Sequence, residues 1–233
     1  MLAIQELMLK EHALFRQLSK KLVERILSIS SIRHLKAGEV LFLKDEAGDA
    51  LYGVLAGRIR ISNRSIEGQE LILKIMEKSD VFGEIALLDG SPRTADAVAL
   101  EDSQLLMIRH RDFTLLLQQE PILALQMIRL LCARIRQSNE YIEDLTFLDT
   151  SRRLAKHLLL VSREGEKIEG GIRLPSISQE ELAQRLGTTR MDLTKQLRYW
   201  QDNGWLSVEK GQITLYDLRS LQTFINSRAD REV

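Results

Sequence analysis

The sequence predicts an α+β fold in which a jelly roll of short strands precedes a long helix and a mainly helical module. Three observations predict this order. Short apolar runs broken by glycines continue to Ile108, a helical period of several turns follows Pro121, and two short helical patterns meet at Gly187. A chain of 233 residues is long enough for two domains.

The composition restricts the class of protein. A hydrophobic fraction of 44% with 28% charged residues is typical of globular proteins. No apolar stretch is long enough to span a bilayer and the N-terminus lacks a signal-peptide pattern, so we expect a cytoplasmic protein without a membrane partner. The single cysteine, Cys132, excludes an internal disulfide and a cysteine-ligated iron–sulfur cluster within one chain.

The net charge of 0 conceals an asymmetry between two parts of the chain. Residues 151–233 contain 14 Lys and Arg against 11 Asp and Glu, a net +3, which leaves 19 against 22, a net −3, for the remainder. A basic C-terminal part is compatible with nucleic-acid binding there, although the bias is small.

The N-terminal half begins with an expected amphipathic helix from about Leu14 to Ser30, and β structure follows from Ile32 to Ile108. Turns that contain glycine separate the expected strands. Strands this short and closely spaced predict a small barrel or jelly roll. The expected strands cover residues 40–43, 50–55, 59–61, 71–75 and 104–108.

The most informative stretch is the run from Phe82 to Ala95. Gly83 lets the backbone approach a ligand closely, and Arg93 is permanently charged and forks onto two phosphate oxygens. Thr94 adds a hydroxyl group, and the backbone N–H groups of residues 84–87 add donors in a nest. The run therefore predicts a cradle for a phosphorylated ligand. Its ligand-binding residues are Gly83, Glu84, Ile85, Ala86, Arg93 and Thr94.

Glu84 extends this prediction to a nucleotide, because a carboxylate accepts a hydrogen bond from a ribose hydroxyl. The alternative is an exposed turn with an incidental arginine. The length and order of the run favour the nucleotide. The run closely resembles the phosphate-binding cassette of cyclic-nucleotide-binding domains, in which Gly-Glu and Arg-Ser/Thr-Ala have these roles.

The helical period beyond Pro121 contains a heptad seam, which is typical of helix pairing. Its length favours a two-chain coiled coil, and packing on the jelly roll is the alternative. Ser138 is a hydroxyl residue in this apolar seam, so it either sets the register or contacts a ligand with its neighbours Asn139 and Arg134. A hinge is expected from Leu145 to Asp149. The seam comprises Ile128, Leu131, Ile135, Ser138, Ile142 and Leu145.

A helix-turn-helix is expected further along the chain. Ser178 and Glu181 form a capping box at the start of one helix, and Gly187 ends it. Thr188 and Thr189 provide a new cap for a second helix that runs toward Asn203. The flanking elements are an expected helix over 151–162, a loop or loose hairpin over 163–173, and a β-hairpin wing over 205–215.

The outer face of the second helix has the chemistry of DNA contact. Arg190 suits a guanine edge, Thr194 suits a thymine methyl group, and basic side chains reach bases or phosphates. Ser178 and Gln179 suit a phosphate contact at a helix N-terminus. The alternatives are a solvated surface or a module that binds protein. The predicted DNA-binding residues are Ser178, Gln179, Thr189, Arg190, Met191, Thr194, Lys195 and Arg198.

From about Leu14 to Leu221 the order of these elements resembles the cyclic AMP receptor protein family of bacterial transcription regulators, including its fumarate–nitrate branch. The resemblance implies a β-roll that binds a cyclic nucleotide over residues 1–120, a dimerisation helix and hinge over 121–149, and a winged helix-turn-helix over 150–233. It also implies that Glu84 holds the ribose 2′-hydroxyl and that Arg93 and Thr94 hold the cyclic phosphate. Arg134, Ser138 and, from the partner chain, Asn139 would contact the ligand.

The resemblance implies a homodimer that binds palindromic double-stranded DNA, and RNA polymerase if it is an activator. Cyclic AMP is the favoured allosteric ligand, and Thr94 leaves cyclic GMP open, since relatives that bind cyclic GMP often have Thr after the arginine. The alternatives are a regulator responding to another ligand or to none, and a nucleotide sensor whose C-terminal module binds protein. No nucleophile–base pair is present in the sequence, so an enzyme is not expected.

Two departures from the family pattern are informative. The run Thr189-Arg190-Met191 stands where the family often has Ser-Arg-Glu, so the acceptor for a cytosine amino group is lost. The cysteine set of the iron–sulfur branch is absent, and no metal, haem or cluster is expected. The histidines are scattered and are interpreted as ordinary surface or core residues; they are His12, His34, His110 and His157.

Overall fold

A computed structural model describes Phe15 and residues 18–227 of the chain. It divides into two compact units, residues 1–137 and 138–233. Helix α5 (Pro121–Phe147) contributes residues to both units. Among the described residues no single helix has both the length and the apolar character needed to cross a membrane. Helices α4 (His110–Gln119) and α5 meet these criteria only together, across a bend of 112°.

The N-terminal unit contains two antiparallel four-stranded sheets. Val54, Ile59, Ala97 and Leu105 are fully buried in one apolar cluster that draws residues from both sheets. This confirms the expected β-roll. The first sheet has the order β1 (Ser30–Leu35), β8 (Ser103–Arg109), β3 (Ala50–Ala56) and β6 (Val81–Phe82), and the second has the order β2 (Val40–Phe42), β7 (Asp96–Ala99), β4 (Ile59–Arg64) and β5 (Glu70–Met76).

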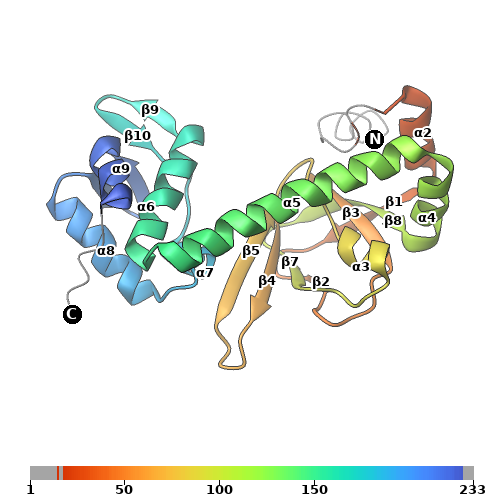
Figure 1. Ribbon diagram of the computed structural model, residues 1–233, viewed down its shortest axis with the longest axis horizontal. Coiled ribbons are helices and arrows are strands. Elements are labelled where there is room, and N and C mark those ends of the chain that lie inside the picture. Colours follow the sequence, from red (N-terminus) through yellow and green to blue (C-terminus); the bar gives the residue numbers. More distant parts are fainter. Residues whose placement is uncertain (1–14, 16–17, 228–233) are drawn as a thin grey trace. The chain divides into compact units, whose positions relative to one another are not determined.

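Helices α2 (Lys20–Ser28), α4 (His110–Gln119) and the start of α5 lie together at one end of the strands (Figure 1). Their buried side chains, with those of the first sheet, form a second apolar cluster. Helix α2 begins later than the expected residue 14, because Ser19 caps it by accepting a hydrogen bond from the Leu22 backbone N–H. Leu14 lies outside the described residues, and α4 was not predicted.

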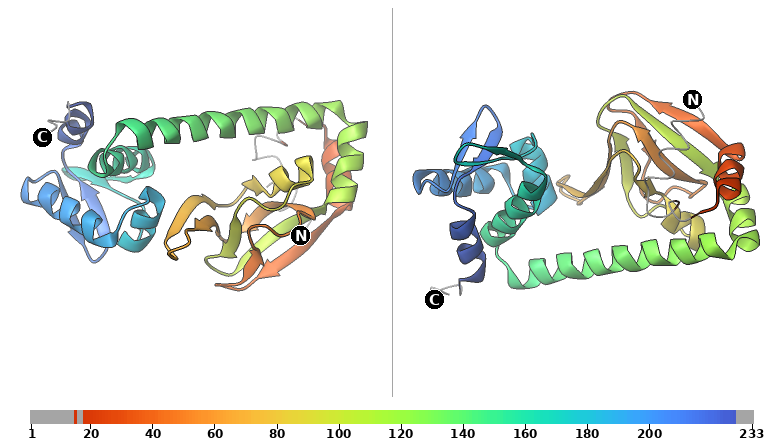
Figure 2. Two further views of the ribbon diagram at one scale, coloured as in Figure 1. Left: turned by 60° about the horizontal axis from the view of Figure 1, so that its bottom comes forward. Right: turned by 90° about the horizontal axis from the view of Figure 1, so that it is seen from above.

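The run that predicted a phosphate cradle forms a short helix, α3 (Glu84–Asp89), between β6 and β7. Gly83 and Gly90 flank this helix, and both have a left-handed backbone with φ of 84° and 72°. Helix α3 lies beside α5 in every view (Figures 1 and 2). The β-roll therefore presents the predicted ligand-binding run toward the long helix.

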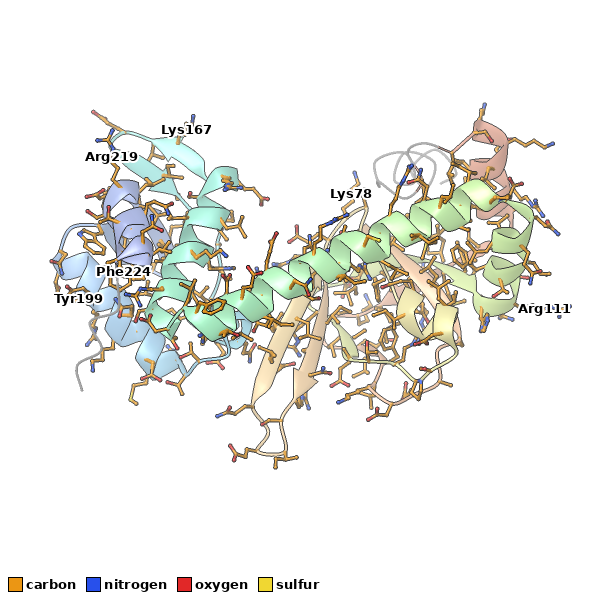
Figure 3. All side chains as sticks on the ribbon, in the orientation of Figure 1. Lys78, Arg111, Lys167, Tyr199, Arg219 and Phe224 are labelled. Carbon is orange, nitrogen blue, oxygen red and sulfur yellow. The ribbon has the colours of Figure 1, made fainter. Side chains whose placement is uncertain are left out.

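In the C-terminal unit, helices and a four-stranded sheet pack around Trp200, which is fully buried. Phe224 packs edge-on against Trp200 in this core, whereas Tyr199 is exposed at the outer edge (Figure 3). The unit follows the chain order α6 (Thr150–Val161), a 3₁₀ turn η1 (Ser162–Glu164), β9 (Glu166–Ile168), β10 (Gly171–Arg173), α7 (Gln179–Leu186), α8 (Arg190–Asp202), β11 (Leu206–Glu209), β12 (Gln212–Leu215) and α9 (Leu218–Asn226).

The helix-turn-helix and its wing are confirmed. Gly187 ends α7 with φ of 62°, and the Thr189 hydroxyl caps α8 by accepting from the Asp192 backbone N–H. The capping box is only half formed, because the Glu181 carboxylate accepts a hydrogen bond from Arg185 at 2.6 Å. The segment expected as a loop or loose hairpin is the hairpin β9–β10, whose second strand pairs with β12. Helix α9 was not predicted.

Candidate functional site

A small cavity of about 70 Å³ lies in the N-terminal unit between the β-roll, α3 and α5. Seven of the nine predicted ligand-binding residues line it, while Ser138 and Asn139 are exposed on α5 and are not among the lining residues. The lining comprises Phe42, Ile61, Met76, Phe82, Gly83, Glu84, Ile85, Ala86, Arg93, Thr94, Ala95 and Arg134.

Gly83 is required at its position for two reasons. Its φ of 84° is in the left-handed region, which disfavours a side chain. A Cβ atom there would also lie 2.9 Å from Nη1 of Arg93 and 3.1 Å from the Ala50 carbonyl oxygen. The glycine therefore makes room for the arginine, and its own carbonyl accepts a hydrogen bond from Nη1 at 2.9 Å.

Arg93 is a buried cation held by several groups. Its Nη2 donates to the Ala50 carbonyl at 3.0 Å and to the Asp49 carboxylate at 3.2 Å. The guanidinium carbon lies 4.2 Å from the centre of the Phe42 ring and 5.7 Å from that of Tyr52, a cation–π arrangement. Nε of Arg93 is buried without a hydrogen-bond partner among the described residues. One donor of the guanidinium is thus available for a ligand.

The loop between β2 and β3 also holds the backbone of Arg93. The Arg93 N–H donates to the Glu46 carbonyl at 2.7 Å, and the Asp45 N–H donates to the Arg93 carbonyl at 2.9 Å. Burial and the nearby Asp49 charge raise the pKa of the Tyr52 phenol above its ordinary value, so this ring stays neutral beneath the arginine. The loop and the ring together fix where the Arg93 charge lies.

Glu84 and Arg134, which also line the cavity, form an ion pair. Nη1 of Arg134 donates to Oε1 of Glu84, and Nη2 donates to the Val81 carbonyl. The Glu84 side chain is 1% exposed, and its second oxygen, Oε2, is buried without a hydrogen-bond partner within the described part of the chain. An unpaired buried acceptor is costly, so Oε2 is suited to receive a donor from a ligand.

The polar groups of the cavity fit a nucleotide, but the volume of the cavity is too small for one in this structure. Arg93 offers a donor for a phosphate, and Oε2 of Glu84 offers an acceptor for a hydroxyl group. Pockets for small ligands generally measure about 300–1,000 Å³, whereas this cavity measures about 70 Å³. Binding a nucleotide here requires side chains to move. Arg134 is the side chain suited to move, because it is 25% exposed whereas its partner Glu84 is 1% exposed.

The second candidate surface is the outer face of α8. Leu193, Leu197 and Trp200 are buried in the core, so the other face of the helix projects outward. That face borders an open groove of about 720 Å³. Five of the predicted DNA-binding residues line this groove, and the lining comprises Arg190, Met191, Thr194, Lys195, Arg198, Tyr199 and Asp202.

The remaining predicted DNA-binding residues are at helix starts. Ser178 caps α7 through its hydroxyl oxygen, which accepts from the Glu181 N–H at 3.0 Å. Gln179 lies in the first turn of α7, and its side-chain oxygen is 3.0 Å from the Thr194 hydroxyl of α8. Thr189 is the cap of α8. The contact between Gln179 and Thr194 links the two helices at the edge of the groove.

Comparison with known proteins identifies both units. The family described as "Cyclic nucleotide-binding domain" matches residues 32–120, and "Crp-like helix-turn-helix domain" matches residues 152–224. A "CRP-like cAMP-activated global transcriptional regulator" of Mycobacterium tuberculosis is 32% identical over 186 residues, 79% of this chain and 83% of the relative. The chain belongs to the cyclic AMP receptor protein and fumarate–nitrate regulator family.

Two further similarities agree with membership of the receptor-protein family. A "Cyclic AMP receptor protein" of Thermus thermophilus is 30% identical over 214 residues, 92% of this chain and 97% of the relative. The solved structure of a CooA mutant from Carboxydothermus hydrogenoformans superimposes with a TM-score of 0.74 at 26% identity, covering 86% of this chain and 89% of that one. Members of this family are DNA-binding transcription regulators with a cyclic-nucleotide-binding domain, not enzymes.

Sequence reasoning did not find Asp49 or the aromatic support of Arg93. Asp49 is 44 residues from Arg93 in the chain, and Phe42 and Tyr52 read as ordinary apolar strand residues. The register of β3 and β6, which pairs Tyr52 with Phe82, brings this support under the cavity. No local signal marks such a contact.

Proposed function

We propose that the chain is a homodimeric transcription regulator whose affinity for palindromic DNA is controlled by a cyclic nucleotide bound in the small cavity. Cyclic AMP is the favoured ligand and cyclic GMP is the alternative. The observation that carries the proposal is the pairing, in one cavity, of a buried arginine donor and a buried carboxylate acceptor, Arg93 and Glu84.

Each group has a role that follows from its chemistry. Arg93 and Thr94 bind the cyclic phosphate, because a guanidinium and a hydroxyl donate to phosphate oxygens. Glu84 accepts from the ribose 2′-hydroxyl, for which its free Oε2 is suited. The backbone of Gly83, Ile85 and Ala86 lines the same cavity.

The long helix carries the second set of proposed contacts. On ligand binding, Arg134 either leaves Glu84 or shares its carboxylate with the ribose. The base is contacted by Ser138 and by Asn139 of a second chain. A ligand that favours one arrangement of α5 then shifts a pre-existing equilibrium of the dimer.

The dimer is supported by the unpartnered seam of α5. Ile128, Ile135 and Ile142 of the seam are 55%, 60% and 58% exposed. Apolar residues at heptad spacing are stabilised when a second helix covers them. We assign residues 1–120 to ligand binding, 121–149 to dimerisation and the hinge, and 150–233 to DNA binding, with the cytoplasm as the place of action.

The DNA is contacted by α8 in the major groove. Arg190 contacts a guanine, Lys195 and Arg198 contact bases or phosphates, and Ser178, Gln179 and Thr189 contact the backbone at helix starts. A basic groove on a two-fold dimer fits a palindromic site. If the protein is an activator, RNA polymerase is its further partner.

A second candidate is a regulator of this family that responds to another ligand or to none. The Arg134–Glu84 ion pair favours it, because the pair already satisfies much of the polar chemistry of the pocket. The names of the relatives from Mycobacterium and Thermus, which refer to cyclic AMP, favour the first candidate.

Isothermal titration calorimetry of the purified, ligand-stripped protein with cyclic AMP and cyclic GMP separates the candidates. We expect saturable binding of both, with tighter binding of cyclic AMP. Arg93→Ala is expected to weaken binding by at least tenfold, since it removes the charge-assisted phosphate contact. Absence of binding by both nucleotides to folded wild-type protein would favour the second candidate.

A further inference from the structure

The first two turns of α8 present an exposed methionine in the groove that we assign to DNA. Met191 is 77% exposed and is the second residue of the helix. The cationic residues Arg190 and Lys195 line the same groove. A large apolar side chain at this exposure has no role in the core of the unit.

The side-chain acceptors nearest Met191 take part in hydrogen bonds within the C-terminal unit. The Asp192 carboxylate accepts from the Thr189 hydroxyl at 2.7 Å. The side-chain oxygen of Gln179 faces the Thr194 hydroxyl at 3.0 Å, and Gln196 accepts from Ser151 at 2.8 Å. None of Asp192, Gln179 and Gln196 is among the residues that line the groove.

Asp202 is the one carboxylate that lines the groove, and it is in the last turn of α8. It is eleven residues beyond Met191, which at a rise of about 1.5 Å per residue is about 16 Å along the helix. In the first two turns of α8 the groove is therefore lined by two cations, Met191 and the Thr194 hydroxyl, and by no carboxylate among the described residues. Cytosine and adenine amino groups need an acceptor, whereas guanine offers acceptors and thymine offers a methyl group.

We propose that Met191 contacts the 5-methyl group of a thymine in the major groove and is a specificity-determining residue of the DNA site. The proposal rests on the proposed DNA-binding function of α8. The flexible thioether side chain follows the position of a methyl group without a fixed geometry. A cytosine at the same place would have its amino group against the apolar side chain of Met191, which offers at most a weak acceptor.

The test removes one methyl group from the DNA at a time. A palindromic site is first obtained by selection from random duplexes, and each thymine of the half-site is then replaced by deoxyuridine on both halves. Burial of one methyl group corresponds to about fourfold in affinity per half-site. We expect this loss at one thymine position, in fluorescence anisotropy measurements at constant salt.

Four variants assign the loss to a residue. Met191→Ala is expected to bind the thymine and deoxyuridine duplexes equally, and Met191→Leu, which keeps an apolar side chain, is expected to retain the preference. Thr194→Ser is the matched control, because it removes only a methyl group and keeps the hydroxyl contacts of Thr194. Met191→Glu is expected to exchange thymine for cytosine at the same position.

Each contrary result has its own meaning. Equal binding of thymine and deoxyuridine duplexes by the wild type overturns the proposal, while sequence-specific binding leaves the proposed function intact. A preference that survives in Met191→Ala and disappears in Thr194→Ser assigns the methyl contact to Thr194 and overturns it as well. If selection yields no preferred duplex, the assignment of α8 to DNA reading and this proposal both fail.

Discussion

Arg134, in the long helix α5, donates a hydrogen bond to Glu84, the first residue of α3, although the two residues are 50 positions apart. Glu84 is also the carboxylate that we assign to the ribose of the ligand. A ligand hydroxyl and the Arg134 guanidinium therefore share one acceptor group. This arrangement connects occupancy of the pocket to the position of α5.

The first prediction concerns the stability of this pair. Arg134→Met leaves the Glu84 carboxylate buried and unpaired, so the free energy of unfolding should fall by about 1–3 kcal/mol. The loss is smaller than for a fully buried pair because Arg134 is 25% exposed. Urea unfolding followed by circular dichroism measures it. The double variant Glu84→Gln/Arg134→Met should recover most of the loss, and a double variant no more stable than Arg134→Met would refute the coupling.

The second prediction concerns Asp49, whose carboxylate occupies Nη2 of Arg93 and is 79% exposed. This carboxylate competes with a phosphate for Arg93 and repels it. Asp49→Asn should therefore raise nucleotide affinity by about three- to tenfold in calorimetry, and the gain should shrink at high salt. Asp45→Asn makes the same change of charge in the same loop without a side-chain contact to Arg93 in the described structure, so it should have little effect. Equal effects of the two variants would show that only overall charge matters.

The third prediction concerns pH. Burial, and secondarily the charge of Arg185, lower the pKa of His157 from 6.5 to about 4. Between these values the unfolded chain binds a proton that the folded chain does not, so stability is full above pH 6.5 and falls as the pH approaches 4. The expected loss is about 2–3 kcal/mol.

The two tryptophans of the chain, Trp200 and Trp205, are both in the C-terminal unit, so their fluorescence reports the unfolding of that unit. Urea unfolding at several pH values should show a shallower pH dependence for His157→Gln than for the wild type. Identical pH dependence in both proteins would mean that His157 is not the responsible group.

The fourth prediction distinguishes base contact from phosphate contact. Arg190→Ala should relax the preference for one guanine in each half-site, at a cost of about 1–3 kcal/mol on the preferred site. Arg198→Ala should weaken binding to all sequences alike and reduce the dependence of affinity on salt by about one unit of slope. Binding to a panel of single-base variants at several salt concentrations measures both effects. Uniform weakening by Arg190→Ala would move the base contact elsewhere on α8.

Local sequence signals were sufficient for much of this fold. The caps Ser178 and Thr189 and the stop at Gly187 mark the two helices of the DNA-binding module, since each acts through neighbouring backbone groups. Helix α3 has only six residues and no side-chain cap, so its sequence predicted a nest of backbone N–H groups in a phosphate cradle rather than a helix.

The long-range contacts of the pocket were beyond local reasoning. Glu84 and Arg134 were both assigned to the ligand, but their contact with each other depends on how α5 lies on the β-roll. Asp49 gave no signal, because a single acidic residue before a strand is ordinary. Both contacts bring charges together across more than forty residues, and only the folded chain specifies them.

The central claim is that a cyclic nucleotide bound beside Arg93 raises affinity for DNA. The most direct test measures the dissociation constant of the selected duplex with and without saturating cyclic AMP, for the wild type and for Arg93→Lys, which keeps the charge but lacks the planar fork. We expect a gain of about 5- to 150-fold for the wild type and none for Arg93→Lys at the same nucleotide concentration. Without cyclic AMP, the two proteins should bind the duplex with equal affinity. A full gain in Arg93→Lys, or no gain in wild-type protein that binds the nucleotide, would contradict the claim.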